Sequence, residues 1–143
     1  FNLHKKFLDA LMQVSPTVKN YKRIADIVNY QILLVKESKK GLNRFLKSES
    51  FSHQEINYFE KVYGNLLNQS LRNLDELTMV ITADKLRMSD DERLQAIDNI
   101  YMEMQDKLLF LRDFNKSSSI LVLQRAKEKK DVYASKELLD LKN

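Results

Sequence analysis

One stretch of the chain, residues 86–98 with the sequence LRMSDDERLQAID, carries the signals that decide the fold class. Ser89 and Glu92 have the spacing of a capping box, in which each side chain accepts a hydrogen bond from the other residue's backbone amide. Apolar residues then recur every three or four positions, the period of one helix face. They are Leu94, Ile97, Ile100, Tyr101, Met104, Leu108 and Leu111. The stretch therefore predicts a long helix over residues 90–114.

The same stretch contains a concentration of acidic residues: Asp90, Asp91, Glu92 and Asp98. Acids at a helix N-terminus are stabilised by the helix dipole and by the free amides of the first turn. Hard cations instead require several oxygens that converge from a loop, usually one with glycine, and this stretch has none. We favour the capping interpretation and expect no metal. The alternative is a cation site formed by Asp90, Asp91 and Asp98.

A second capping box opens the preceding helix. Ser52 and Glu55 have the required spacing, and the apolar pattern predicts a helix from His53 to about Thr82. The residues expected on its inner face are Ile56, Phe59, Val62, Tyr63, Leu66, Leu71, Leu74, Leu77 and Ile81.

Two further helices are predicted nearer the N-terminus. Residues 3–13 place apolar side chains on one helical stripe, and Ser15 followed by Pro16 is a favourable helix start. The next helix should cover residues 16–46. Gly41 lies inside it and weakens it by about 1 kcal/mol relative to alanine, which predicts a bend or a break.

The C-terminal quarter leaves alternatives open. Residues 115–119, NKSSS, favour turns because their side chains bond to nearby backbone. A separate helix over 119–131 is one possibility, and a continuous kinked rod with 90–114 is the other. Residues 134–143 form a last short helix or fray. The pattern predicts an all-α antiparallel bundle of four to five helices with short loops.

Bulk composition supports one helical domain over residues 1–143. Two glycines and one proline argue against a β-sandwich, and the lack of cysteine excludes disulfides and thiolate metal sites. No apolar run reaches the length of a membrane span. Because the chain begins at Phe1 without an initiator Met, we expect a fragment or a processed form.

Charge is distributed unevenly along the chain. Residues 1–47 carry ten Lys or Arg and three Asp or Glu, whereas residues 89–115 carry three and seven. We expect neighbouring helices to complement each other's charge. A nucleic-acid interface, which should be more one-sided, is a weaker alternative.

Residue patterns for reaction chemistry are missing from the sequence. His4 and His53 lack metal-ligand spacing, and two glycines cannot form a phosphate loop. The acidic pairs at 75–76 and at 103 and 106 are expected to face water or lysines. We therefore predict a protein that is not an enzyme, with no cofactor and no small-molecule substrate.

Several stretches resemble the small exported helical proteins encoded in bacterial conjugative transposons, some labelled conjugal transfer protein and some TerB-like tellurite resistance protein. They are residues 1–4 (FNLH), 21–28 (YKRIADIV), 73–82 (NLDELTMVIT), 86–97, and 105–107 continuing to 124–127 (QRAK). The similarity covers nearly the whole chain through helix-forming strings, and no functional residue is carried over from it.

The resemblance implies a signal peptide and a further helical segment before this domain, and a place in the periplasm or cell envelope. It also implies a structural or interaction role in conjugative DNA transfer, beside a type IV secretion-like apparatus. The expected partners are other proteins of that apparatus or a second copy of the chain. The alternative is a TerB-like tellurite or stress-resistance protein that binds a cation at its acidic helix start.

Overall fold

A computed structural model describes residue 5 and residues 15–82 and 87–142 of the chain. Its helices are α2 (Pro16–Lys19), α3 (Lys22–Lys47), α4 (His53–Ile81) and α5 (Asp90–Lys142). No strand occurs in this part of the chain, so the predicted all-α class is confirmed.

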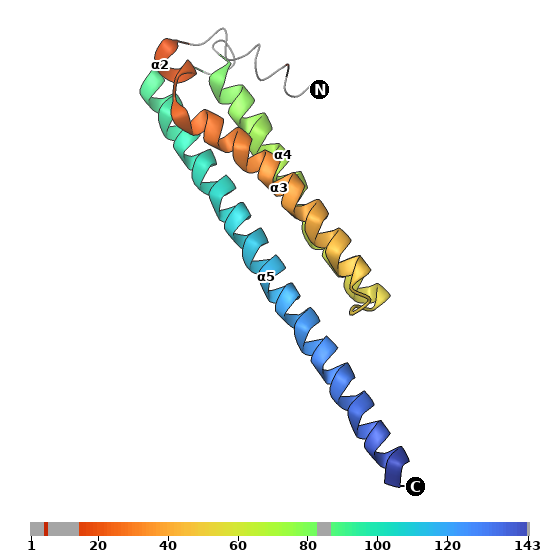
Figure 1. The fold of residues 1–143 in the computed structure, drawn as a ribbon. Helices are drawn as coiled ribbons and strands as arrows, with labels where there is room; N and C mark the ends of the chain where they lie inside the picture. Colours follow the sequence, from red (N-terminus) through yellow and green to blue (C-terminus); the bar gives the residue numbers. More distant parts are fainter. Residues whose placement is uncertain (1–4, 6–14, 83–86, 143) are drawn as a thin grey trace.

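The three long helices form a bundle in which α4 runs antiparallel to α3 and α5 (Figure 1). Helices α3 and α5 run in the same direction and share the largest interface. The predicted number of four to five helices is not confirmed, because the described residues hold three long helices and the single turn α2. The helix predicted over 3–13 lies outside the described residues, apart from Lys5.

Helix α5 is continuous through residues 115–119, where the sequence allowed either a break or one continuous helix. Asn115 and Ser118 of the NKSSS segment are buried against the other helices. The Asn115 side chain bonds to Tyr63 and to the Glu37 carbonyl of α3, so it does not compete for its own backbone. The alternative of a separate helix over 119–131 is therefore wrong, and so is a short helix separate from it after residue 134, because α5 runs unbroken to Lys142.

Both capping boxes are confirmed. The Ser52 amide donates to Glu55 Oε1 at 3.0 Å, and the Glu55 amide donates to Ser52 Oγ at 3.2 Å. Ser89 and Glu92 make the same reciprocal pair at 3.1 and 3.2 Å. Each helix start is thus encoded by one pair of residues that lie three positions apart.

The predicted helix over 16–46 is divided at its start. Ser15 caps the turn α2 by accepting from the Val18 amide at 3.4 Å, and the helical path is interrupted at Asn20 and Tyr21 before α3 begins. Val18 is fully buried, which anchors α2 against the bundle.

The core of the bundle consists mainly of aliphatic and aromatic side chains from the three long helices. Fully buried examples are Ile27, Leu34, Phe45, Leu77, Ile81, Ile97, Met104 and Leu111. One predicted inward residue is wrong, because Leu71 is 41% exposed. Its neighbour Asn73 is buried instead and donates from Nδ2 to Glu103 Oε2 of α5 at 2.6 Å.

A buried arginine joins the end of α4 to the start of α5. Arg93 is 5% exposed, and its Nη1 donates to the carbonyls of Val80 and Thr82. A cation at a helix C-terminus offsets the negative end of the helix dipole and satisfies carbonyls that lack intrahelical partners. Arg93 therefore holds the two helix ends together through the interior of the bundle.

The three long helices approach one another closely at Gly41. Helix α3 continues through this residue without a break. A Cβ atom at this position would lie 2.6 Å from Tyr63 Oη and 2.8 Å from Asn115 Oδ1. These two atoms are themselves joined, since Tyr63 donates to Asn115 Oδ1 at 2.6 Å. Burial raises the pKa of Tyr63 to about 12, so the phenol stays protonated as a donor. The predicted break at Gly41 is wrong.

The two glycines provide a matched test of this contact. Gly64 of α4 has open space around it, so Gly64→Ala should stabilise the protein by about 0.5–1 kcal/mol through helix propensity. Gly41→Ala should instead destabilise it by about 1–3 kcal/mol, because the methyl group displaces Tyr63 and Asn115. Urea unfolding measures both, and equal stabilisation by the two alanines would contradict the close approach.

Candidate interaction surface

The acidic residues at the start of α5 contact α2 and the beginning of α3. Asp90 Oδ2 accepts from Ser15 Oγ at 3.0 Å. Asp98 Oδ1 accepts from the Tyr21 hydroxyl at 2.5 Å and lies 3.2 Å from Arg23 Nη1. The bond to Asp98 raises the pKa of Tyr21. Asp90 and Asp98 therefore connect helix α5 to the start of α2 and to the start of α3.

The geometry gives little support to a cation site at these positions. Asp90 and Asp91 are exposed in the first turn, whereas Asp98 lies two turns further along and is engaged by Tyr21 and Arg23. Within the described ranges, no three His, Cys, Asp or Glu side chains gather as metal ligands would.

The remaining candidates for chemistry are dispersed over the surface. His53 is exposed at the first position of α4, and His4 lies outside the described residues. The acids at 75, 76, 103 and 106 are all exposed. An open groove of about 670 Å³ lies between α4 and α5, and it includes Glu103 and Asp106 beside Lys107 and Phe110. Glu103 is already bound by Asn73.

Arg125 fixes α5 at the end of the bundle. Its Nη1 and Nη2 donate to the two carboxylate oxygens of Glu55 at 2.9 and 2.8 Å, and Nη1 also donates to the Ser50 carbonyl at 2.9 Å. The guanidinium carbon lies 5.2 Å from the centre of the Phe51 ring. A bidentate, planar pair of this kind is geometrically specific. It clamps α5 to the loop between α3 and α4.

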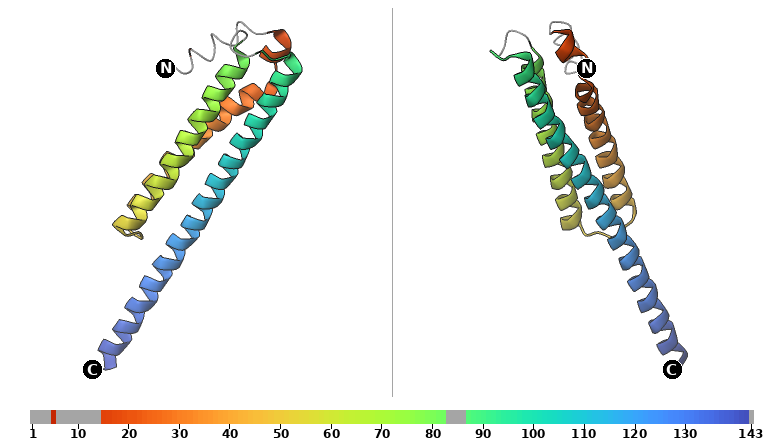
Figure 2. Two further views of the ribbon diagram at one scale, coloured as in Figure 1. Left: turned by 180° about the vertical axis from the view of Figure 1, so that it is seen from behind. Right: turned by 90° about the vertical axis from the view of Figure 1, so that its left-hand side faces the viewer.

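Beyond this clamp, α5 leaves the bundle. The residues from Ala126 to Asp140 are all exposed, and the helix extends well past the loop between α3 and α4 (Figures 1 and 2). Residues 126–142 span about 25 Å at 1.5 Å per residue. We call them the protruding helix. Large apolar side chains lie in the open on it: Val132, Tyr133, Leu138 and Leu139, each more than 60% exposed.

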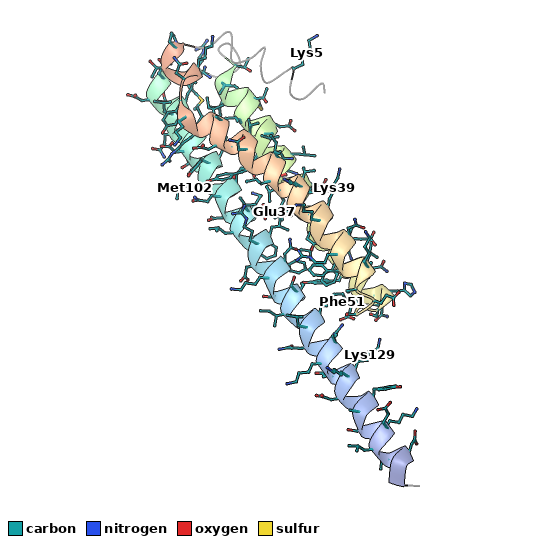
Figure 3. The ribbon with its side chains drawn as sticks, in the orientation of Figure 1. Lys5, Glu37, Lys39, Phe51, Met102 and Lys129 are labelled. Carbon is teal, nitrogen blue, oxygen red and sulfur yellow. The ribbon has the colours of Figure 1, made fainter. Side chains whose placement is uncertain are left out.

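Positive charge surrounds the base of the protruding helix. Lys39, Lys40, Arg44 and Lys47 are exposed on the last turns of α3, and Lys127, Lys129 and Lys130 are exposed on α5. In Figure 3, Lys39 extends from α3 above Phe51, and Lys129 extends from α5 below it. The basic residues therefore collect at one end of the bundle.

Sequence reasoning missed the main features of this surface. It gave no indication of the pairing of Arg125, because Glu55 lies 70 positions earlier in the chain. It also left residues 134–143, which include Leu138 and Leu139, as a last short helix or a frayed end. A continued seven-residue spacing from Arg125 through Val132 to Leu139 is the signal that could have revealed one long helix.

The chain matches no protein-family model, no curated protein and no solved structure. Among the described residues, no helix combines the length and the apolar character needed to cross a bilayer.

The Arg125 clamp should make stability depend on pH. The Arg125 guanidinium, and then the Ser52 amide, lower the pKa of Glu55 to about 2 from its usual 4.5. The ionised form is thus favoured by folding, and its contribution is complete above pH 4.5 and lost as the pH falls towards 2. We expect the wild-type protein to be more stable than Glu55→Gln at pH 7, with the difference shrinking over that window in urea titrations.

Glu60 is the matched control, since it is an exposed glutamate on the same helix. Glu60→Gln should change the free energy of unfolding little at either pH. A Glu55→Gln difference that stays constant from pH 7 to pH 2 would contradict the proposed clamp.

Removing the protruding helix should leave the bundle intact. A chain that ends at Arg125 should keep its free energy of unfolding within about 0.5 kcal/mol, because the side chains from Ala126 to Asp140 are exposed. Arg125→Ala in the full chain should destabilise the protein more than the truncation does, because it removes the pair with Glu55. Circular dichroism with urea measures both, and a loss above about 2 kcal/mol on truncation would show that residues 126–142 support the core.

Proposed function

We propose that this chain is a non-enzymatic interaction component that contacts other proteins through its protruding helix. The observation that carries the proposal is the exposure of Val132, Tyr133, Leu138 and Leu139 on a helix that the bundle does not cover. Burying apolar surface contributes about 25 cal/mol per Å², so a partner that covers these side chains gains binding energy. The bundle acts as the rigid support of that helix.

We further propose that the setting is conjugative DNA transfer, in the periplasm or cell envelope beside a type IV secretion-like apparatus. The support for this setting is the similarity of five stretches of sequence to exported proteins of conjugative transposons. The all-helical fold agrees with this similarity, because those proteins are expected to be helical. The basic end of the bundle would orient an incoming partner, because complementary charge steers association and register more than it adds affinity.

A cation-binding role in tellurite or stress resistance has less support. It requires Asp98 to join Asp90 and Asp91, yet Asp98 is held by Tyr21 and Arg23.

Gene deletion tests the proposal. Loss of the gene should lower conjugation frequency, and the intact gene should restore it. The same gene lacking the codons for residues 126–142 should fail to restore it, although the bundle still folds. Unchanged transfer together with altered tellurite tolerance in the deletion strain would overturn the proposed function.

A further inference from the structure

We propose that a row of cations along one side of the molecule binds the phosphate backbone of a nucleic-acid duplex, without reading its sequence. The row begins on α3 and continues onto the protruding helix. We call it the basic strip, and its members are Lys36, Lys40, Arg44, Lys47, Lys127 and Lys130. This inference goes beyond the proposed function, because the basic strip is a different surface from the exposed apolar side chains named there.

The α3 part of the basic strip lies on one exposed side of that helix. Its members, Lys36, Lys40, Arg44 and Lys47, follow one another at spacings of four, four and three residues, and such residues are neighbours on a helix surface. The last three, together with Asn43 and Ser48, line an open hollow of about 540 Å³. The described residues that line it include no acid. This side of α3 therefore offers positive charge and neutral hydrogen-bond donors.

The helix dipole accounts for only part of this charge. Cations are favoured in the last turn of a helix, where the two members nearest the end of α3 lie. Lys36 and Lys40 lie two to three turns before that end, and cations four residues apart repel each other. Both carboxylate oxygens of Glu37, the acid between them, accept hydrogen bonds from Arg112 of α5. The cations of α3 therefore remain available to an external anion.

The basic strip continues on α5 past the end of α3. Arg112 binds Glu37, so its side of α5 faces α3. Lys130 lies 18 residues after Arg112, which is five full turns, and it is therefore on the same side of α5. Lys127 lies about one turn before Lys130 and neighbours it. Because α5 extends beyond the end of α3 (Figure 1), these two lysines carry the row on past Lys47.

The length of the basic strip fits an extended polyanion better than a single phosphate. Lys36 adjoins Glu37, which is level with Arg112, and the helix from Arg112 to Lys130 rises by about 27 Å. One strand of a duplex carries a phosphate every ~3.4 Å along the axis, so the basic strip spans about eight of them. A phosphodiester backbone supplies negative charge along this whole length.

The basic strip is also narrow, which favours a strand of phosphates over a flat anionic membrane. Asp106, Asp113 and Asp131 are exposed on one side of α5, at spacings of 7 and 18 residues. Asp131 lies one turn after Lys127, so this acidic row borders the basic strip. A flat membrane that meets the basic strip also approaches the acids, whereas one strand follows the cations alone.

A duplex suits the basic strip better than unpaired bases do. Proteins that bind single strands stack the bases on aromatic side chains, and the basic strip has no aromatic member. Its cations can contact phosphates alone, and the two strands of a duplex together carry one charge per ~1.7 Å of axis. Contacts of this kind position a protein on a duplex without selecting a sequence.

Fluorescence anisotropy with a labelled duplex tests the proposal. A duplex of about 30 base pairs exceeds the length of the basic strip, and the full chain should bind it with a Kd of about 10⁻⁵ M near physiological salt. With five cations on phosphates, the affinity should fall about 500-fold between about 50 and 200 mM salt. A duplex of unrelated sequence should bind equally. Absence of binding at the lower salt, or binding that salt leaves unchanged, would overturn the proposal.

Two matched pairs of substitutions locate the surface. Lys36 and Lys47 lie eleven residues apart on α3, Lys61 and Arg72 lie eleven residues apart on α4, and all four are exposed. Lys36→Gln with Lys47→Gln should weaken duplex binding about tenfold and reduce the slope of log affinity against log salt by about two. Lys61→Gln with Arg72→Gln removes the same charge and should weaken it much less. Equal weakening by the two pairs would show that net charge alone is responsible and would contradict the basic strip.

Co-sedimentation with phosphatidylglycerol vesicles separates the duplex from a membrane. At a salt concentration where the duplex is bound, most of the chain should stay in the supernatant. Pelleting with vesicles that the α3 substitutions abolish, without duplex binding, would assign the basic strip to a membrane and reject the proposal. Duplex binding without a conjugation defect in the deletion strain would instead reject the proposed function alone.

Discussion

The structure depends on one buried contact at which the three long helices meet. Gly41 of α3 leaves room for the hydroxyl of Tyr63 from α4, and that hydroxyl donates to Asn115 of α5. The Asn115 amide in turn donates to the Glu37 carbonyl of α3 at 3.3 Å. A buried polar network holds its members in one arrangement, because any slip would leave donors or acceptors unsatisfied. The contact therefore fixes how far each helix lies along its neighbours.

That register determines where the bundle ends and the protruding helix begins. With Asn115 opposite Tyr63, the next turns of α5 bring Arg125 level with Glu55 at the start of α4. The buried core ends at the level of Arg125, but helix α5 continues beyond it. An isolated helix of this length is marginal in water, because nucleation is costly. Here nucleation has already occurred within the bundle, and the exposed turns extend an existing helix.

The charged residues have different roles at the two ends of the bundle. Acids at the start of α5 cap the helix and bind Ser15, Tyr21 and Arg23, so they serve the fold. The basic residues at the opposite end surround the base of the protruding helix and remain exposed. Electrostatic contacts thus stabilise one end of the bundle, whereas the basic side chains at the other end stay exposed.

Local sequence determined the helical class, the two capping boxes and most of the buried stripe, because those signals act between residues three or four positions apart. Only the tertiary structure decided the rest. The NKSSS segment continues as helix because Asn115 finds partners on α3 and α4. Asn73 is buried in place of the predicted Leu71 because Glu103 lies opposite. Arg125 is a clamp and not one more basic residue because Glu55 comes from 70 positions away. Each outcome depends on a partner that periodicity along one helix cannot reveal.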